Sequence, residues 1–219
     1  MLFRSLAGVR TIRTRGKIDG IGLTRLTLDH RGHFPGVGVR SFQIDGPDVA
    51  TKRINKRLRK PFDDPETNWL PCLKMSLANN AFEGESVDEI EPRLIGKRWV
   101  SAVETISYFC GGAHPEDATV PLLFDRTTGA DVDPFTFIAN RKALFAEIFD
   151  RLEPSRKDCE GVIREATDWT AEVTRTGMIF RQQLPRVIMA CGEDVELPFT
   201  RLQPWLNAKG RAAVASLPR

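Results

Sequence analysis

The stretch YFCGGAHPEDATVPLLFDRTTGADVDPF, residues 108–135, is the most informative part of this chain for predicting its fold. It places a cysteine, a glycine pair, a histidine and several acids between segments rich in β-branched and aromatic residues. This composition fits either a catalytic or metal site or a tight connection between two strands. Gly111 and Gly112 allow positive φ where a strand breaks, and Pro115 holds His114 in an extended conformation. We therefore predict two strands joined by a turn.

A catalytic role for this stretch would make His114 a general base, with Glu116, Asp117 or Asp125 as its partner. The sequence has no G-x-S-x-G turn, no H-E-x-x-H helix and no phosphate-binding glycine loop. The structural interpretation explains more of the residues, so we predict no catalytic residue. His114 and Asp125 are the candidates if the chain is an enzyme. We expect the His114 ring to hydrogen-bond the backbone across the turn.

The sequence also predicts no metal and no cofactor. A catalytic zinc site needs three protein ligands, and the other histidines, His30 and His33, lie in a separate glycine-rich segment. The end of the stretch has the residues of a turn instead. Asp125 is typical of the residue that opens an Asx-type turn, and Gly129 occupies the position that requires positive φ.

Two segments have the periodicity of amphipathic helices. Residues 48–60 have Asp48 as the N-cap, an apolar face that begins at Val49, and Pro61 as the stop. Residues 139–153 have leucine and isoleucine at helical spacing, directly after a second helix start with aspartate and proline. Each helix would pack one face on a sheet.

Most other segments predict strands, because they are rich in β-branched and aromatic residues or lie between turn signals. These segments are 37–46, 72–82, 89–112, 119–125, 170–185 and 187–199. The order is strand, helix, several strands, helix, strands and helix. It predicts an α+β fold with a mainly antiparallel sheet and helices packed on one face.

The chain has 219 residues, of which 41% are hydrophobic and 28% charged, and its net charge is +3. This content can form one substantial core, and so small a charge gives no argument for nucleic-acid binding. Residues 1–40 hold eight Arg or Lys against two Asp. We predict a basic glycine-rich arm over residues 1–37, either unordered or a hairpin. An α+β domain follows over 38–219, in which two subdomains would meet near 108–115.

The chain has four isolated cysteines, Cys72, Cys110, Cys159 and Cys191, and none belongs to a CxxC pair. Their spacing is compatible with two disulfides and with four separate buried thiols, and both interpretations remain open. No run of about 20 apolar residues could span a bilayer. No signal peptide is visible, because the apolar run after the basic start is too short. Nothing in the sequence indicates the oligomeric state.

One pattern in the chain resembles a known family. An aromatic residue is followed by Gly-Gly-Ala-His-Pro, a strand ending in Phe-Asp, a Thr-Gly turn and a helix start with proline. The residues that carry it are Tyr108, Gly111, Gly112, Ala113, His114, Pro115, Phe124, Asp125, Thr128, Gly129, Asp133, Pro134 and Phe135. The pattern resembles the RsiV-like family, known as domain of unknown function 3298. An upstream strand and helix with Ile54-Asn55 resemble its usual preceding partner domain, so the resemblance covers about residues 38–210.

The resemblance implies an α+β fold and a periplasmic or extracellular setting rather than a cytoplasmic one. The best-described members are membrane-anchored anti-sigma factors whose exported domain binds lysozyme, and others accompany peptidoglycan deacetylase domains. This sequence has no transmembrane, sigma-binding or deacetylase segment, so only the architecture and the envelope setting are carried over. An exported chain would pair Cys72 with Cys110 and Cys159 with Cys191, with crossed pairings still open.

These observations predict a non-catalytic exported protein that binds a protein ligand, such as a lysozyme-like or other peptidoglycan-directed enzyme. Two alternatives remain. In the first, the chain is an enzyme or enzyme accessory that acts on cell-wall polysaccharide through His114 and nearby acids. In the second, it is an immunity-type protein that neutralises an antibacterial toxin.

Overall fold

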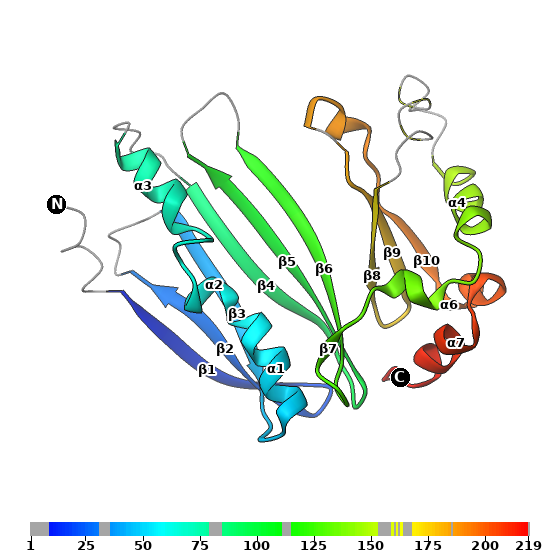
Figure 1. Ribbon diagram of the computed structural model, residues 1–219, viewed down its shortest axis with the longest axis horizontal. Coiled ribbons are helices and arrows are strands. Elements are labelled where there is room, and N and C mark those ends of the chain that lie inside the picture. The colour runs from blue at the N-terminus through cyan, green and yellow to red at the C-terminus, as the bar shows by residue number, and fades with distance from the viewer. Residues whose placement is uncertain are drawn as a thin grey trace.

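The computed structural model of the protein describes residues 9–30, 36–78, 85–110, 115–152, 159, 161, 163, 168–184 and 186–218. These residues form two β-sheets, one of seven strands and one of three, with helices packed on both. In Figure 1 the large sheet occupies the left and centre, and the small sheet lies to its right with the C-terminal helices. The predicted α+β class is confirmed, since the described residues combine a large, mainly antiparallel sheet with several helices.

The large sheet keeps the order of the chain, so each strand from β1 to β7 neighbours the next. All neighbours are antiparallel except β3 and β4, which are parallel. A parallel pair needs a crossover connection, and a helical segment between these two strands supplies it. The strands are β1 Arg10–Ile18, β2 Ile21–Asp29, β3 Val37–Ile44, β4 Glu85–Ile95, β5 Trp99–Phe109, β6 Glu116–Asp125 and β7 Ala130–Asp131.

The basic arm contains a hairpin at the edge of the large sheet. Strands β1 and β2 pair along their whole length, and Asp19 and Gly20 form the turn with φ values of 54° and 75°. Positive φ at both central residues belongs to the two-residue turn that suits a β-hairpin. β1 is exposed over almost all of its length, whereas β2 buries Leu23 and Leu26. β2 therefore supplies most of the hairpin's contribution to the core, and β1 adds only Ile18 at its end.

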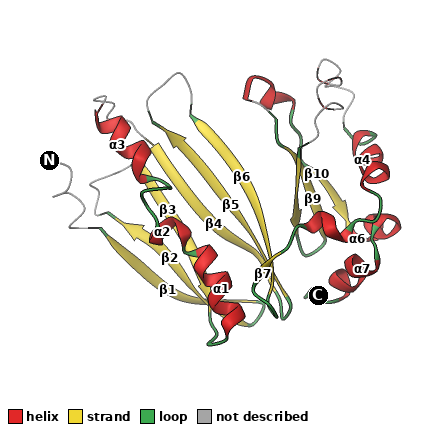
Figure 2. Cartoon of the chain, in the orientation of Figure 1, coloured by secondary structure: helices red, strands yellow, loops and turns green. Residues whose placement is uncertain are grey.

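The crossover between β3 and β4 lies on one face of the large sheet (Figure 2) and consists of α1 Val49–Leu58, α2 Lys60–Asp63 and α3 Leu70–Ala78. Asp48 caps α1 as predicted, since its carboxylate accepts a hydrogen bond of 2.8 Å from the backbone N–H three residues on. Ile54 and Leu58 are fully buried. Val49 is 65% exposed, so its predicted place on the apolar face is wrong. The buried face contains Ala50, Thr51, Ile54 and Leu58, and a spacing of five residues places Val49 to the side of Ile54. α1 ends at Leu58, before Pro61, and Pro61 lies at the second position of α2.

The strand predicted over 72–82 is wrong for the part that the structure describes. Residues 70–78 form α3, and residues 79–84 lie outside the described part. Leucine, methionine, lysine and alanine favour a helix, and periodicity alone does not separate a short apolar helix from a buried strand. The outcome depends on contacts with distant segments: α3 packs on β4 and β5, and a disulfide joins Cys72 to Cys110.

The small sheet has the antiparallel order β10–β9–β8. The segment predicted as strand over 170–185 forms a hairpin that turns before Gly177. Glycine is required there because a Cβ atom would collide with the carbonyl oxygen of Leu197. The strand predicted from residue 187 is wrong, because residues 186–191 form the 3-10 helix η4. This run is short and apolar, and the Cys159–Cys191 disulfide fixes its end. The strands are β8 Trp169–Val173, β9 Gly177–Gln182 and β10 Val195–Pro198.

The predicted helix over 139–153 is present as α4, which buries Leu144 and Ile148 completely. The helix start at Asp133 and Pro134 is a single 3-10 turn, in which the Asp133 carboxylate accepts a hydrogen bond of 2.8 Å from a backbone N–H. The helices around the small sheet are η2 Pro134–Phe137, α4 Arg141–Phe149, η4 Arg186–Cys191, α6 Phe199–Leu202, η5 Gln203–Trp205 and α7 Ala208–Ala215.

The pair β5 and β6 separates two hydrophobic cores. Val100 and Phe124 pack with α1 on one side, whereas their chain neighbours Trp99 and Leu123 pack with the small sheet and its helices on the other. Successive side chains of a strand point to opposite faces, so this hairpin is buried on both. Trp99 also donates a hydrogen bond of 2.8 Å to the hydroxyl of Ser216 beyond α7. The hairpin thus ties the two parts of the fold together.

Candidate functional site

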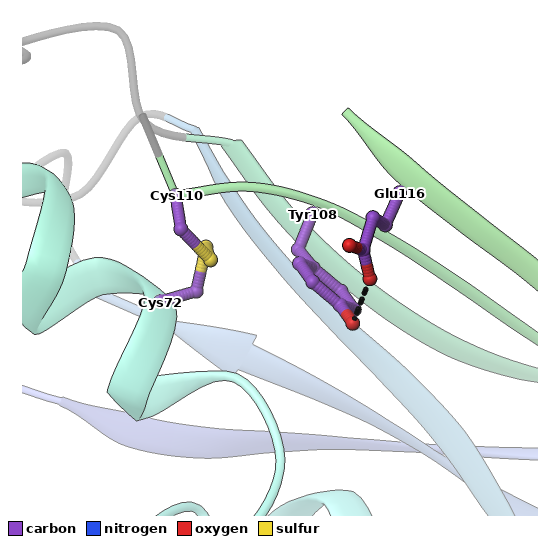
Figure 3. The surroundings of a disulfide bond; sticks show 4 residues. All are labelled: Cys72, Tyr108, Cys110 and Glu116. Carbon is purple, nitrogen blue, oxygen red and sulfur yellow. Dashed lines mark hydrogen bonds between the residues drawn. A yellow bond between two sulfur atoms is a disulfide. The ribbon is translucent and has the colours of Figure 1, made fainter. Parts of the chain in front are cut away.

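The first half of the stretch 108–135 lies at one end of the β5–β6 pair. The hydroxyl of Tyr108 donates a hydrogen bond of 2.6 Å to the Glu116 carboxylate (Figure 3), and this bond raises the pKa of the tyrosine. Cys110 directly follows β5 and forms a disulfide with Cys72 on α3. Residues 111–114, the glycine pair, alanine and histidine of the motif, lie outside the described residues, so the role predicted for that histidine stays a prediction.

The second half of the stretch lies at the opposite end of the same pair. Asp125 accepts hydrogen bonds from the backbone N–H and the hydroxyl of Thr127, at 2.8 and 2.5 Å, and lies 3.6 Å from a guanidinium nitrogen of Arg98. Burial acts to raise the pKa of Asp125, but these hydrogen bonds and the nearby Arg98 outweigh it and lower the pKa. Gly129 has a φ of 72° and packs against the backbone of α1 at Ala50.

These two ends are separated by the length of β6. Tyr108 pairs with Glu116 and Trp99 with Asp125, so ten residues of strand lie between the ends. Ten extended residues span about 30 Å. Asp125 is therefore far from Cys110 and Pro115, which flank the glycine-histidine segment, and its oxygens are engaged in its own turn. The hydrogen bonds of Asp125 give it a structural role in its own turn.

A groove, called here the α3 groove, opens beside the Cys72–Cys110 disulfide. Its volume is about 340 Å³. One wall is α3 with the segment before it, including Trp69 and Met75, and the floor is β4 and β5. Trp69 is nearly buried and donates a hydrogen bond of 3.1 Å to the carbonyl of Pro61, whereas Met75 is 53% exposed. The disulfide holds the helical wall on the sheet.

Asp88 on β4 is the unusual group on the floor of the groove. The residue is 3% exposed, and no hydrogen-bond partner of its Oδ1 atom exists among the described residues. Burial raises the pKa of Asp88 to about 7, and the nearby carboxylate of Glu104 adds to this rise, although Arg57 and Lys60 oppose it. Arg57 donates to both oxygens of Glu104, at 3.3 and 2.5 Å. Asp88 is therefore a buried acid without a dedicated counter-charge.

The sequence reasoning above did not find Asp88. A usable signal exists in β4, where Ser86, Asp88 and Ile90 alternate with more exposed residues and all face inward. An acid at an inward position of an alternating strand is a candidate for function, because burial perturbs its pKa. The segment that forms the opposite wall was predicted as a strand, so no groove could be expected there.

A second, more polar cleft of about 260 Å³ lies between β6 and the small sheet. It is lined by Asp117 of β6 and by Arg181, Asp194 and Met189 from the other side. Arg181 is held by Glu172, at 2.6 Å, and by Asp194, at 2.7 Å. Asp117, one of the acids considered as a partner of His114, thus belongs to a different surface from the α3 groove.

Both cysteine pairings implied by the resemblance are present, Cys72 with Cys110 and Cys159 with Cys191. Two disulfides are typical of a protein in an oxidising compartment outside the cytoplasm. Within the ranges that the structure covers, no cluster of three or more His, Cys, Asp or Glu could hold a metal ion. No helix in the same ranges is long and apolar enough to cross a membrane.

Comparison with solved structures finds this architecture elsewhere. A member of the DUF3298 family from Bacteroides fragilis matches 95% of this chain and 96% of its own, with a TM-score of 0.56 and 10% sequence identity. The chain shares the fold of this DUF3298 protein. A second DUF3298 structure, from Pseudomonas aeruginosa, covers 91% of this chain and 95% of its own, with a TM-score of 0.46 and 12% identity. No family model and no curated protein matches the sequence.

The likeness to the DUF3298 protein concerns the architecture alone. The DUF3298 designation itself stands for a domain of unknown function, so it names no activity or ligand. The RsiV-like assignment and the preceding partner domain stay predictions. Any functional statement must therefore come from the groove, the cleft and the disulfides of this chain.

Proposed function

We propose that this chain is a non-catalytic exported protein of the cell envelope, periplasmic or extracellular, that binds a protein ligand in the α3 groove. The ligand is a lysozyme-like or other peptidoglycan-directed enzyme, a class taken from the RsiV-like resemblance. The observation that carries the proposal is the groove itself, which places apolar side chains beside Asp88, a buried acid whose Oδ1 atom has no partner among the described residues. The two disulfides support the setting, because the envelope exterior is an oxidising compartment.

The walls of the groove suit a protein surface. Met75 is one of the few large apolar side chains that are exposed, and methionine adapts its shape to different partners. Trp69 stays fixed by its hydrogen bond to Pro61, which provides a rigid apolar surface beside the flexible one. The disulfide from α3 to β5 preorganises the two walls, and preorganisation lowers the entropic cost of binding.

The test is a binding measurement with immobilised protein and two probes, a chicken-type lysozyme and a bacterial cell-wall amidase. Met75→Trp fills the groove with a bulky side chain and should weaken binding by about tenfold or more, since a blocked pocket loses its anchor contacts. Met189→Trp is the matched control, because Met189 is also exposed, at 42%, but lines the second cleft. Failure of both probes to bind the wild-type protein, or equal binding by the two variants, would contradict the proposal.

The second cleft favours one alternative function, action on cell-wall polysaccharide as an enzyme or an enzyme accessory. Asp117, Asp194 and Arg181 offer the carboxylates and donors that recognise sugar hydroxyls. Under this alternative, soluble peptidoglycan fragments bind the wild-type protein, and Met189→Trp rather than Met75→Trp abolishes the binding. The same pair of variants therefore separates the two functions.

A further inference from the structure

Asp88 is a buried acid with an oxygen that lacks, among the described residues, the hydrogen-bond partner that buried carboxyl oxygens usually have. A buried carboxylate without hydrogen bonds is costly, and such groups are usually paired or bonded. Asp88 is 3% exposed and its Oδ1 atom has no partner in the described part of the chain. The residue is also part of the lining of the α3 groove, which has room for a ligand. The missing donor can therefore come from an occupant.

The charges around Asp88 favour a cationic occupant. Glu104 on β5 contributes a second carboxylate, and both of its oxygens are bound to Arg57 of α1. One guanidinium thus serves two carboxylates. Lys60 of α2 also acts on Asp88, but it is exposed to solvent, which screens its charge. A positive group seated on Asp88 would balance the second carboxylate.

The size and lining of the α3 groove indicate which kind of cationic group would fit it. Trp69, Met75 and Ile106 supply its apolar surface, beside polar residues such as Thr67 and Asn68. Its volume of about 340 Å³ lies near the lower end of ligand sites, which run from about 300 to 1,000 Å³. A slender aliphatic stem with a charged end matches such a site, because the stem packs on the walls while the end meets the acid. Lysine and arginine side chains have this form.

We infer that the α3 groove takes a lysine or arginine side chain of the protein ligand, whose cationic end pairs with Asp88 while its aliphatic stem packs against Trp69 and Met75. This inference rests on the proposed function for the source of the side chain. The pairing itself belongs to the groove and can be tested without that ligand. The anchor would be a single desolvated ion pair at the centre of the interface, where binding energy concentrates.

The test uses the full chain and a small probe, Nα-acetyl-lysine methylamide, whose binding is followed by NMR shifts of groove residues. The second probe is its neutral isostere, Nα-acetyl-2-aminoheptanoic acid methylamide, hereafter the norleucine-type probe, in which a methyl group replaces the ammonium group. The lysine probe should bind, and its affinity should rise by roughly thirtyfold between about pH 5.5 and 8, because the carboxyl must lose its proton to pair with the amine. The norleucine-type probe should bind about tenfold more weakly at the higher pH.

Two variants complete the experiment. Asp88→Asn keeps the shape of the side chain and should abolish both the preference for the lysine probe and its pH dependence. Glu66→Gln is the matched control, because it removes an exposed carboxylate beside the groove that is paired with Lys74 at 2.6 Å. This control should leave the affinity and the pH profile unchanged.

The outcomes separate this inference from the proposed function. Equal binding of the two probes, or a lysine preference that survives in Asp88→Asn, overturns the cationic anchor even if a lysozyme or amidase binds in a Met75-dependent manner. A lysine preference that depends on Asp88 upholds the anchor even if neither protein probe binds. In that second case the named class of protein ligand is wrong and the groove still accepts a cation.

Discussion

The two ends of the β5–β6 region hold carboxylates in opposite situations. At one end, Asp125 receives two hydrogen bonds from Thr127 and lies beside Arg98, and its pKa is lowered although burial opposes the change. At the other end, Asp88 lies on β4 beside β5, is nearly buried, and has an oxygen without a partner. Burial raises its pKa to about 7. The same chemical group is satisfied in one place and unsatisfied in the other.

This difference separates a structural acid from a candidate functional one. The partners of Asp125 are Thr127 in its own turn and the nearby Arg98, so the residue stabilises the local structure and has little capacity left for a ligand. Asp88 destabilises the fold when ionised and gains partners only if something enters the groove. Perturbed acids in clefts are functional candidates for this reason.

The largest expected effect concerns the two disulfides, of which only Cys72–Cys110 lies beside the α3 groove that contains Asp88. The bonds close loops with sequence separations of 38 and 32 residues, so each stabilises the fold by about 4 kcal/mol in the chain-entropy model. Replacing Cys72 and Cys110 by serine, or Cys159 and Cys191 by serine, should lower the free energy of unfolding by similar amounts in urea. Only the first replacement should also weaken lysine-probe binding, since only that bond holds the wall of the α3 groove.

Two measurements would contradict this expectation. Non-reducing peptide mapping of protein expressed in the periplasm should find both bridges and no free thiol. Four free thiols would remove the basis for the envelope setting. Equal loss of probe binding in both pairs of variants would mean that the groove depends on global stability rather than on its own disulfide.

The next effect is the pH dependence of stability that Asp88 contributes. Its folded-state pKa is raised above the unfolded value of 3.8, so folding takes up a proton and this group stabilises the fold most at low pH. The stability declines as pH rises from about 4 to 7, and the full penalty is present above the folded pKa. A shift of this size corresponds to about 4 kcal/mol at most. Asp88→Asn should therefore raise the free energy of unfolding at about pH 8 by about 2–4 kcal/mol, and by much less near pH 4.

Asp125→Asn is the control for this prediction, because the sign should reverse. The pKa of Asp125 is lowered in the folded state, so its stabilisation is present above the unfolded pKa and is lost as pH falls through the folded one. Asparagine should cost about 1 kcal/mol at neutral pH and little in acid, since it weakens the bonds to Thr127. Urea unfolding at the two pH values measures both variants. If the free energy of unfolding changed in the same direction with pH in both variants, the two carboxyls would not differ in the way that their burial and hydrogen bonds predict.

The smallest effect concerns Tyr108, the single tyrosine of the chain. Its hydrogen bond to the Glu116 carboxylate raises its pKa above the ordinary value of 10.0. Ultraviolet absorbance of tyrosinate against pH reports this one group, so the midpoint should lie above that of a free tyrosine. Glu116→Gln should return the midpoint toward the ordinary value, because the carboxylate charge is gone. An identical midpoint in the two proteins would mean that the bond does not persist in solution.

Much of the fold can be predicted from local signals in the sequence. The Asp48 cap, the Asx turn at Asp125 and the positive φ at Gly129 depend on residues within a few positions of one another, so the sequence alone contains the physical reason for each. The strands β5 and β6 have enough β-branched and aromatic residues to be found in the same way.

Other features depend on distant segments and were missed. The apolar runs that form α3 and η4 are too short for periodicity to distinguish a helix from a strand. Each of these segments is also held by a disulfide to a distant cysteine, Cys110 or Cys159. Asp88 lies in a strand whose alternation marks it as inward, but its lack of a partner depends on α1, α3 and β5 together.

The sequence by itself thus determined the α+β class, the strands on both sides of the 108–135 turn and the capping residues, because short-range backbone preferences suffice for these. Which of the acids has hydrogen-bond partners, and which lines a groove, depends on the tertiary structure. It placed Asp125 a strand's length from the Tyr108 end and brought Trp69 and Met75 over Asp88 to form the α3 groove. Burial and hydrogen-bond partners arise only when segments distant in the chain pack together, and these two quantities set the charge of a carboxyl and its capacity to bind.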